Sequence, residues 1–256
     1  MSAPFTAEAV VLGAIAYGEA DRVVTLFSRT HGKLGAMARG ARKSRSRFGA
    51  ALSLYVTGEA TLRERRGAEL MTLESFHARR DFSSLALDVV RLGHAAYATE
   101  LVRELTVPHR PDPPLYDLLV ELYATVAERP PRASTLRAFE LRLLEELGLA
   151  PALDRCVSCA AAGDVLDRAV LDAARGGLVC ARCSAGHSLR LLAAPARLRL
   201  LEVRAQVSLD DAAALPPAGS EVEEGARGAM HALLEAHLSR PVRSLEFMKK
   251  LRASHA

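Results

Sequence analysis

Hydrophobic residues in the first third of the chain fall in short runs, several of which are closed by a glycine. The runs lie at residues 10–12, 23–27, 34–37, 52–62 and 70–76. Runs of this length, rich in β-branched residues and separated by glycine turns, are typical of a small all-β unit. Five strands within residues 5–76 fit a closed barrel such as an OB-fold, which leaves no strand edge exposed. The pattern also fits an SH3-like barrel or an open sheet.

The spacing of hydrophobic positions becomes helical after Ser83. Helical stripes lie at residues 90–105, 115–126 and 136–147, and further helices are indicated at 198–207, 222–238 and 245–251. Ser134 is a favourable N-cap for the third stripe, and Gly148 is a stop signal. The sequence therefore predicts that most of the remaining chain is helical and that these stripes form a packed core.

The chain holds four cysteines, and all of them lie between two helical parts. They are Cys156, Cys159, Cys180 and Cys183, two C-x2-C pairs separated by twenty residues. Each pair places two thiolates on one tight turn, and two such turns supply the closed tetrahedral set that structural zinc takes. A redox pair would be expected beside a βαβ unit, which the pattern does not show. The spacing predicts one structural zinc ion, with His187 as an alternative ligand that four sulfurs make unnecessary.

Charge is distributed unevenly along the chain. Residues 1–80 carry 13 Lys and Arg against 7 Asp and Glu, whereas residues 81–256 carry 21 against 23. The first third therefore has a net charge of +6 and the remainder −2, which sum to the total of +4. An anionic partner would meet mainly the N-terminal region.

The densest charge lies in the stretch RGARKSRSRFG at residues 39–49, between the third and fourth expected strands. It holds five cations and no acid: Arg39, Arg42, Lys43, Arg45 and Arg47. Small residues between the cations let backbone N–H groups and hydroxyls approach phosphate oxygens. Few aromatic residues lie nearby for base stacking (Tyr17, Phe27, Phe48 and Tyr55), so nucleic-acid binding would be mainly electrostatic and salt-dependent.

Two other interpretations of this basic stretch remain open. It is either a solvated surface run, or one edge of a wider basic face. The further cations of such a face would be Arg63, Arg65, Arg66, Arg79 and Arg80.

Sequence motifs of the common enzyme classes are absent. The chain has no phosphate-binding loop, dinucleotide fingerprint, nucleophile elbow or H-E-x-x-H motif. The seven acids of residues 1–80 form no cluster in sequence that would suggest a two-metal nuclease. We therefore expect a binding protein without covalent catalysis.

No membrane segment is predicted. No apolar run reaches the roughly 18–20 residues that cross a bilayer. Glu8 precedes the apolar residues 9–17 and no basic segment lies ahead of them, which argues against a signal peptide. We expect a cytoplasmic chain with reduced thiols and no membrane partner.

Three stretches resemble the RecO family of bacterial recombination mediators, and the resemblance extends over nearly the whole chain. They are YGEADRVVTLFSRTHGKLGAMARGARKSRSR at 17–47, RAFELRLLEELGLAPALDRCVSC at 137–159 and RSLEFMKKL at 243–251. One departure is Ala160, where the family usually has glycine. The resemblance implies an α+β multidomain protein: an N-terminal all-β OB-fold barrel followed by an all-α domain with an inserted four-cysteine zinc motif. The corresponding domains are 1–80, 81–154 and 188–256 (helical), and 155–187 (zinc insert).

The resemblance also implies a function. Members of the family act in the RecF-type recombination pathway, bind single- and double-stranded DNA, and anneal complementary strands. With RecR they help load RecA onto DNA covered by single-strand-binding protein, whose acidic and apolar C-terminal tail they engage. A bacterial, nucleoid-associated location follows. For DNA contact the resemblance favours Arg39, Arg42, Lys43, Arg45 and Arg47, with Arg22 and Lys33 in support. The alternative is a zinc-ribbon scaffold that binds only protein partners.

Overall fold

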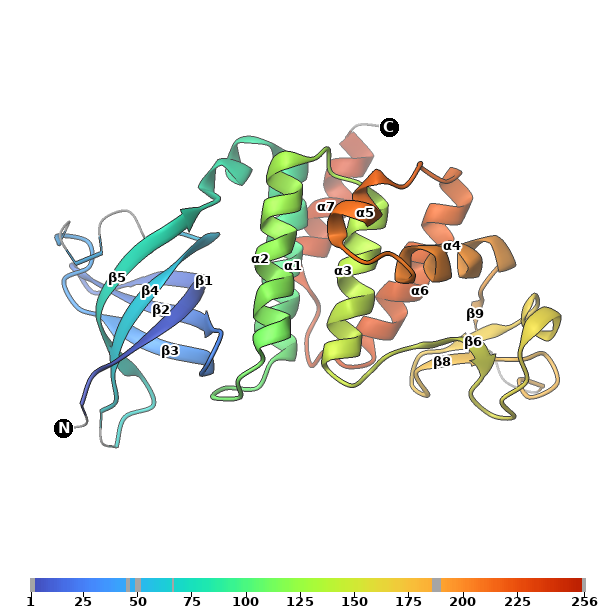
Figure 1. Ribbon diagram of the computed structural model, residues 1–256, viewed down its shortest axis with the longest axis horizontal. Helices are drawn as coiled ribbons and strands as arrows, with labels where there is room; N and C mark the ends of the chain where they lie inside the picture. The colour runs from blue at the N-terminus through green and yellow to red at the C-terminus, as the bar shows by residue number, and fades with distance from the viewer. Residues whose placement is uncertain (1–2, 45–46, 49–51, 66, 186–189, 255–256) are drawn as a thin grey trace. The chain divides into compact units, whose positions relative to one another are not determined.

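The computed structural model describes residues 3–44, 47–48, 52–65, 67–185 and 190–254. The chain forms two compact units (Figure 1). The first unit comprises residues 1–128 and 242–256, and the second comprises residues 129–241.

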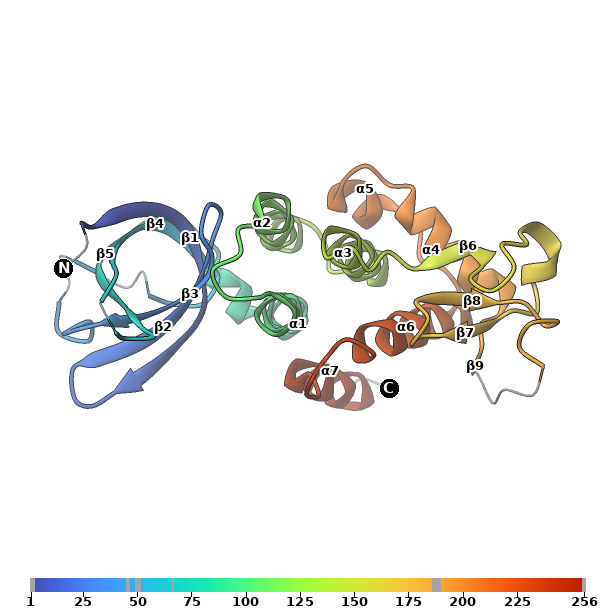
Figure 2. The same cartoon turned by 90° about the horizontal axis from the view of Figure 1, so that it is seen from below.

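The first unit begins with a closed five-stranded barrel. Its strands are β1 (Phe5–Tyr17), β2 (Asp21–Ser28), β3 (Gly32–Ala38), β4 (Val56–Arg63) and β5 (Met71–Asp81). They pair in the order β1-β2-β3-β5-β4 and form a ring in Figure 2. Only the β3–β5 pair is parallel, at Ala36↔Met71, whereas the other four pairs are antiparallel. This closed, OB-like topology confirms the sequence prediction for the N-terminal fold.

Alternation of inward and outward residues builds the barrel core. In β3 every second side chain is buried, from Leu34 through Ala36 to Ala38. Alanines at inward positions, including Ala36 of β3 and Ala60 of β4, leave room in the core for larger side chains such as Leu62 and Leu73. Mixed small and large residues fill so narrow a barrel without voids, and they leave the outward positions for function.

The strand predicted at residues 52–62 begins later than expected. Residues Leu52–Tyr55 form turns, and β4 starts only at Val56. The cause is local: Tyr55 has a left-handed φ of 68°, and the carbonyl of Leu52 accepts a hydrogen bond from the Arg22 side chain. Because of these two features, residues 52–55 do not pair with a neighbouring strand. Leu52 and Tyr55 are nevertheless buried.

Three helices complete the first unit after a short 3-10 helix, η1 (Ser83–Leu87). They are α1 (Val89–Leu105), α2 (Pro113–Glu128) and α7 (Arg243–Ser254). The Asp88 carboxylate caps α1, because it accepts hydrogen bonds from the backbone N–H groups of Val90 and Arg91.

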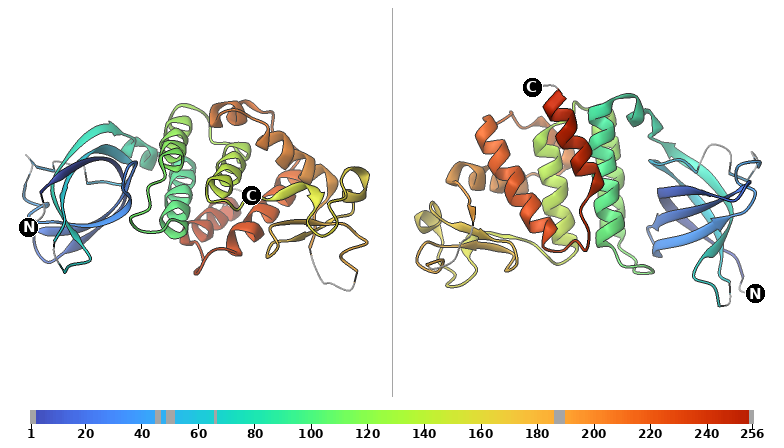
Figure 3. Two further views of the ribbon diagram at one scale, coloured as in Figure 1. Left: turned by 60° about the horizontal axis from the view of Figure 1, so that its bottom comes forward. Right: turned by 180° about the vertical axis from the view of Figure 1, so that it is seen from behind.

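Helix α7 returns to α1 from the far end of the sequence (Figure 3). The buried Glu100 carboxylate in α1 accepts hydrogen bonds from the backbone N–H groups of Arg243 and Ser244, at 3.1 and 2.8 Å. It also accepts one from the Ser244 hydroxyl at 2.6 Å. A carboxylate at a helix N-terminus satisfies otherwise orphaned donors and complements the helix dipole. Glu100 therefore joins segments that are more than one hundred residues apart.

The second unit is built on four helices and a small sheet. The helices are α3 (Ala133–Glu146), α4 (Ala194–Arg204), α5 (Leu209–Ala214) and α6 (Ser220–Glu235). Ser134 was wrongly predicted as the N-cap of α3: Arg132 occupies that position, and Ser134 is buried inside the helix. Gly148, with φ 75°, follows the end of α3 as predicted.

The sheet of the second unit lies between α3 and α4 in sequence. It contains β6 (Ala152–Cys156), β7 (Val170–Asp172), β8 (Gly177–Val179) and β9 (Arg190–Leu191), in the order β6-β8-β7-β9, with a short 3-10 helix, η2 (Gly163–Leu166). The predicted fold class, a β barrel followed by helices with an inserted four-cysteine motif, is thus confirmed. The domain boundaries drawn at residues 80, 154 and 187 stay predictions.

Over the part of the chain that the structure describes, no helix is both long and apolar enough to cross a membrane.

Candidate metal centre and nucleic-acid interface

The sheet of the second unit brings the two cysteine pairs together. Strand β6 ends at Cys156, and Cys180 directly follows the end of β8. Because β6 and β8 are parallel neighbours, both C-x2-C turns leave the same edge of the sheet. Close packing fixes this register: a Cβ atom on Gly177 would lie 2.7 Å from the carbonyl oxygen of Ala152.

The four sulfur atoms converge as the spacing predicts. The Sγ atoms of Cys156, Cys159, Cys180 and Cys183 all lie within 4.8 Å of one another, and those of Cys159 and Cys180 are 3.9 Å apart. A tetrahedral ion with bonds of about 2.3 Å to sulfur requires sulfur–sulfur distances of roughly 3.8 Å. The four cysteines can therefore hold one metal ion, and the geometry is consistent with zinc. His187 lies outside the described residues.

Hydrogen bonds lower the pKa of two of these four thiols. Burial acts to raise the pKa of Cys156, but backbone N–H groups of Cys180 and Ser158, with bonds from Cys159, outweigh it and lower this pKa to about 6. A bond from the backbone of Ala161 lowers the pKa of Cys159. By contrast, hydrogen bonds to the sulfurs of Cys159 and Cys180 raise the pKa of Cys183. A bound cation would favour the thiolate form of all four cysteines, and because protons compete with the metal for sulfur, the metal affinity should fall in acid.

The arrangement suits a structural metal rather than a catalytic one. Four thiolates close the coordination sphere and leave no position for water or substrate. The core beside them is small: its buried residues include Leu153, Leu166, Leu171, Leu178 and Val179. A bound ion would supply stability that so few apolar side chains do not.

Ala160, the one departure from the family pattern in the first cysteine turn, has a left-handed φ of 58°. Its backbone N–H donates to the carbonyl of Cys156 at 2.9 Å, which closes the turn. An alanine in this conformation costs about 1 kcal/mol relative to glycine.

We therefore predict that Ala160→Gly stabilises the metal-binding sheet by about 1 kcal/mol. Chemical denaturation monitored in the second unit measures this, with Ala161→Gly as the matched control. The control should gain nothing, because Ala161 is not among the residues with a positive φ. An equal gain in both variants, or a loss in Ala160→Gly, would contradict a strained turn.

The described start of the basic stretch, residues 39–44, forms a tight turn at the end of β3. Gly40 adopts a left-handed φ of 67°, and its N–H donates to the Asp21 carboxylate at 2.8 Å. The backbone N–H of Arg42 donates to the carbonyl of Ala20 at 3.0 Å. The turn at residues 39–44, here named the basic turn, is therefore held against the turn that joins β1 and β2.

The four described cations of the basic stretch are exposed, and within the described residues none pairs with a carboxylate. They are Arg39, Arg42, Lys43 and Arg47. The side chain of Arg47 donates to the carbonyl of Arg39 at 3.0 Å and lies 5.1 Å above the Phe48 ring. Phe48 itself is buried, so it anchors the segment in the barrel. The structure thus holds positive charge on a fixed backbone without neutralising it.

The other predicted contacts are placed differently. The half-buried Arg22 donates to the carbonyl of Leu52 at 3.0 Å. The ammonium of Lys33 donates to the carbonyl of Arg103 at the end of α1, so it connects β3 to that helix. Arg45 lies outside the described residues. Among the described cations of the basic stretch, the side chains of Arg39 and Lys43 therefore make the fewest contacts within the protein.

Several arginines of the wider basic face are engaged by acids across the β4–β5 pair. Arg63 lies 2.6 Å from Glu74, and Arg79 lies 2.9 Å from Glu59. Arg80 lies 4.7 Å above the Phe82 ring. Arg65 is exposed, and Arg66 lies outside the described residues. These pairs reduce the field of the β4–β5 face and favour the basic turn as the stronger anion site.

An apolar surface beside the basic turn was missed from sequence. Ile15 and Tyr17 are 66% and 59% exposed, and both occupy outward positions of β1. Ile15 pairs with Val23, and Val23 pairs with Met37, so one outward face carries all three. Of the four aromatic residues considered for base stacking, only Tyr17 is exposed; Phe27, Phe48 and Tyr55 are buried. The sequence signal that could have predicted this surface is the alternation of large and small residues at positions 13–17, where Ile15 and Tyr17 share one side of the strand.

An OB-like barrel with an unneutralised basic turn, together with helices and four convergent cysteines, defines a class of multidomain proteins with a candidate metal site. Models of two families match the chain: Recombination protein O N terminal at residues 1–82, and Recombination protein O C terminal at residues 86–246. The chain belongs to the RecO family of DNA repair proteins.

Curated relatives agree over nearly the full length. The DNA repair protein RecO of Anaeromyxobacter dehalogenans (strain 2CP-C) is 42% identical over 243 residues, which cover 94% of both chains. The DNA repair protein RecO of Myxococcus xanthus (strain DK1622) is 37% identical over 247 residues, covering 95% of this chain and 96% of the relative.

Proposed function

We propose that this chain is a recombination mediator that binds single- and double-stranded DNA and anneals complementary strands. The observation that carries this proposal is the basic turn: exposed cations on a fixed backbone, with no carboxylate partner among the described residues. Membership of a DNA repair family supports DNA as the polyanion.

The proposed mechanism breaks no covalent bond. Two complementary strands repel each other because both are polyanions, and a cationic surface that holds them lowers this repulsion and raises their local concentration. Arg39, Arg42, Lys43 and Arg47 contact phosphates, and Arg22 and Lys33 support this contact with the DNA. Arg45 belongs to the same proposal by its place in the sequence.

We also propose that the four cysteines hold one zinc ion, because cysteine-only tetrahedral sites suit zinc. In this proposal the ion stabilises the second unit and takes no part in chemistry. The residues that hold it are Cys156, Cys159, Cys180 and Cys183, as the convergence of their sulfur atoms supports.

The partners are proposed from the resemblance to the family. With RecR, the chain helps load RecA onto DNA covered by single-strand-binding protein, and it engages the C-terminal tail of that protein. The site of action is the bacterial cytoplasm, at the nucleoid. Bacterial relatives named as DNA repair proteins support this location.

An annealing assay tests the proposal. Two complementary oligonucleotides, labelled as a fluorescence donor and acceptor, are mixed with and without the full chain at 50 and 300 mM salt. We expect faster pairing with protein, and a smaller acceleration at high salt because phosphate contacts weaken. No acceleration at low salt, combined with no mobility shift of either strand, would favour a zinc-ribbon scaffold that binds only protein.

A further inference from the structure

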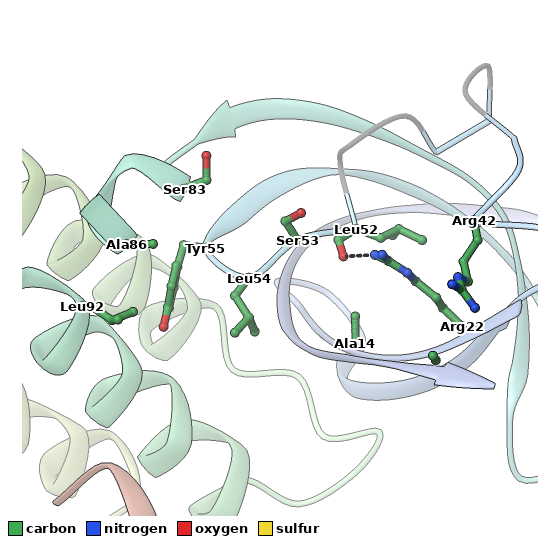
Figure 4. Close-up of a pocket in the computed structure, with 11 residues that line it drawn as sticks. Ala14, Arg22, Arg42, Leu52, Ser53, Leu54, Tyr55, Ser83, Ala86 and Leu92 are labelled. Atoms are coloured by element: carbon green, nitrogen blue, oxygen red, sulfur yellow. Dashed lines mark hydrogen bonds between the residues drawn. The ribbon is translucent and has the colours of Figure 1, made fainter. Parts of the chain in front are cut away.

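A cavity of about 550 Å³ opens beside the basic turn (Figure 4). Its walls come from β1, β2, the segment before β4, η1 and the start of α1, and all of these elements belong to the first unit. Cavities of several hundred Å³ are the size of small-molecule and nucleotide sites. The cavity has two chemically different ends, and the difference indicates what it holds.

One end of the cavity is cationic. Arg22 from β2 and Arg42 from the basic turn lie next to each other there (Figure 4). Each guanidinium donates one hydrogen bond to a backbone carbonyl, Arg22 to Leu52 at 3.0 Å and Arg42 to Glu19 at 3.1 Å. These bonds orient the two side chains without neutralising them, and neither has a carboxylate ion pair within the described residues. Most of their ten N–H donors remain for an anion.

The other end of the cavity is apolar. Leu54, Tyr55, Ala86 and Leu92 line it (Figure 4). Leu54 is 40% exposed, although Leu52 and Tyr55 in the same short segment are buried. An apolar wall and a cationic end within one cavity are the combination found in ligand pockets, which are mostly apolar with a few placed polar groups.

Backbone strain supports a binding role for this end. Tyr55 has a φ of 68°, which costs a bulky residue about 1–3 kcal/mol. Its ring is fixed by an edge-on contact with Tyr123, with centroids 5.4 Å apart. The strained conformation turns the chain so that Leu54 lines the cavity, and strain of this kind concentrates at ligand sites.

We propose that this cavity binds one nucleotide of a bound single strand, with its phosphate on Arg22 and Arg42 and its base against Leu54 and Leu92. The proposal rests on the proposed function, because Arg42 belongs both to the cavity and to the basic turn that holds the strand. A phosphate and a flat apolar base match the two ends, and adjacent phosphates of the same strand reach Lys43 and Arg39.

This site discriminates between single and double strands. A base in a duplex is stacked and paired, and removing it costs a few kcal/mol, whereas a base in a single strand is free to enter. A strand that pairs with its complement withdraws its base from the cavity. The cavity therefore adds affinity only before annealing and favours release of the product duplex.

The test fills the apolar end without changing charge. Ala86→Trp places an indole in the cavity from the exposed surface of η1, and Ala86→Ser is the matched control. We expect Ala86→Trp to bind a 15-nucleotide single strand about tenfold more weakly, since the apolar burial of one base face is lost. Its affinity for a duplex and its salt slope on the single strand should equal those of Ala86→Ser, because the phosphate contacts are intact.

A second readout reports the base itself. In an oligonucleotide that contains 2-aminopurine, the fluorescence should rise when the unchanged protein extracts this base from its stacked neighbours, and the rise should be absent in Ala86→Trp. Melting temperatures of both variants verify that they fold. Should Ala86→Trp not fold, Leu54→Ser, at an exposed position, replaces it and should also weaken single-strand binding, because it removes an apolar wall of the base site without changing charge.

The outcomes separate this inference from the proposed function. Equal single-strand affinities for Ala86→Trp and Ala86→Ser overturn the cavity site while leaving DNA binding in place. Absence of salt-dependent DNA binding in the unchanged protein overturns both. If instead an acidic peptide with an apolar C-terminal residue binds the unchanged protein but not Ala86→Trp, and DNA affinity does not differ, the cavity is a peptide site and the nucleotide proposal is wrong.

Discussion

Replacing Cys180 with serine should remove the metal ion and unfold the small sheet of the second unit. Cys180 is buried, directly follows β8, and donates its backbone N–H to the Cys156 sulfur at 3.4 Å. Its loss opens the closed site and exposes the remaining sulfurs to water. Structural zinc commonly supplies about 10–16 kcal/mol of apparent binding energy, so losing a ligand should lower the free energy of unfolding of this unit by about 4 kcal/mol or more.

Metal analysis by mass spectrometry, combined with thermal denaturation, measures both effects. The unchanged protein should hold one zinc ion per chain, and Cys180→Ser far less. Ser158→Ala is the matched control: its side chain is exposed, and only its backbone N–H contacts the cysteine cluster. Single-strand affinity of Cys180→Ser should stay within about twofold, because the basic turn belongs to the other unit. Full zinc content and unaltered stability in this variant would rule out a four-thiolate structural site.

Replacing Arg39 and Lys43 together with alanine should weaken DNA binding strongly. Both side chains are exposed, and among the described residues neither pairs with an acid, so each is available to a phosphate. A phosphate contact to a single strand contributes a salt slope of about −0.7, which corresponds to roughly fivefold in affinity at 0.1 M salt. The double variant should therefore lose about 25-fold in affinity at this salt concentration.

The chain offers a control with the same change in net charge. Arg63 and Arg79 are on the same barrel, but Glu74 and Glu59 neutralise them at 2.6 and 2.9 Å. Arg63→Ala/Arg79→Ala should bind a single strand within about threefold of the unchanged protein. Fluorescence anisotropy with a labelled oligonucleotide measures both variants. A loss as large in the control would show that a wide basic face, rather than the basic turn, holds DNA.

Local patterns in the sequence were sufficient for the strands of the first unit and for the cysteine centre, but they did not distinguish a closed OB-like barrel from an SH3-like barrel or an open sheet. Alternation in β3 and the glycines that close each run mark strands, because a period of two and a left-handed turn are local properties. The C-x2-C spacing predicts convergent sulfurs for the same reason: each turn is built from adjacent residues. The parallel pairing of β6 with β8, which unites the two turns, required the structure.

Nonlocal contacts explain what sequence did not predict. The sequence does not show that Arg63 forms an ion pair with Glu74, because this pairing depends on the register of β4 against β5. The cavity depends on the left-handed Tyr55, which the apparent alternation of residues 52–56 concealed. The α7 cap likewise joins Glu100 to Ser244 across the sequence, and its distance of 2.8 Å reflects tertiary packing.

The salt dependence of single-strand binding tests the role of the basic turn most directly. The binding constant is measured between 50 and 300 mM salt for Arg39→Ala/Lys43→Ala and for Arg63→Ala/Arg79→Ala. We predict that the logarithmic slope of the first variant is shallower than that of the second by about 1.4, the loss of two phosphate contacts. Equal slopes in the two variants would contradict a DNA-binding role for the basic turn.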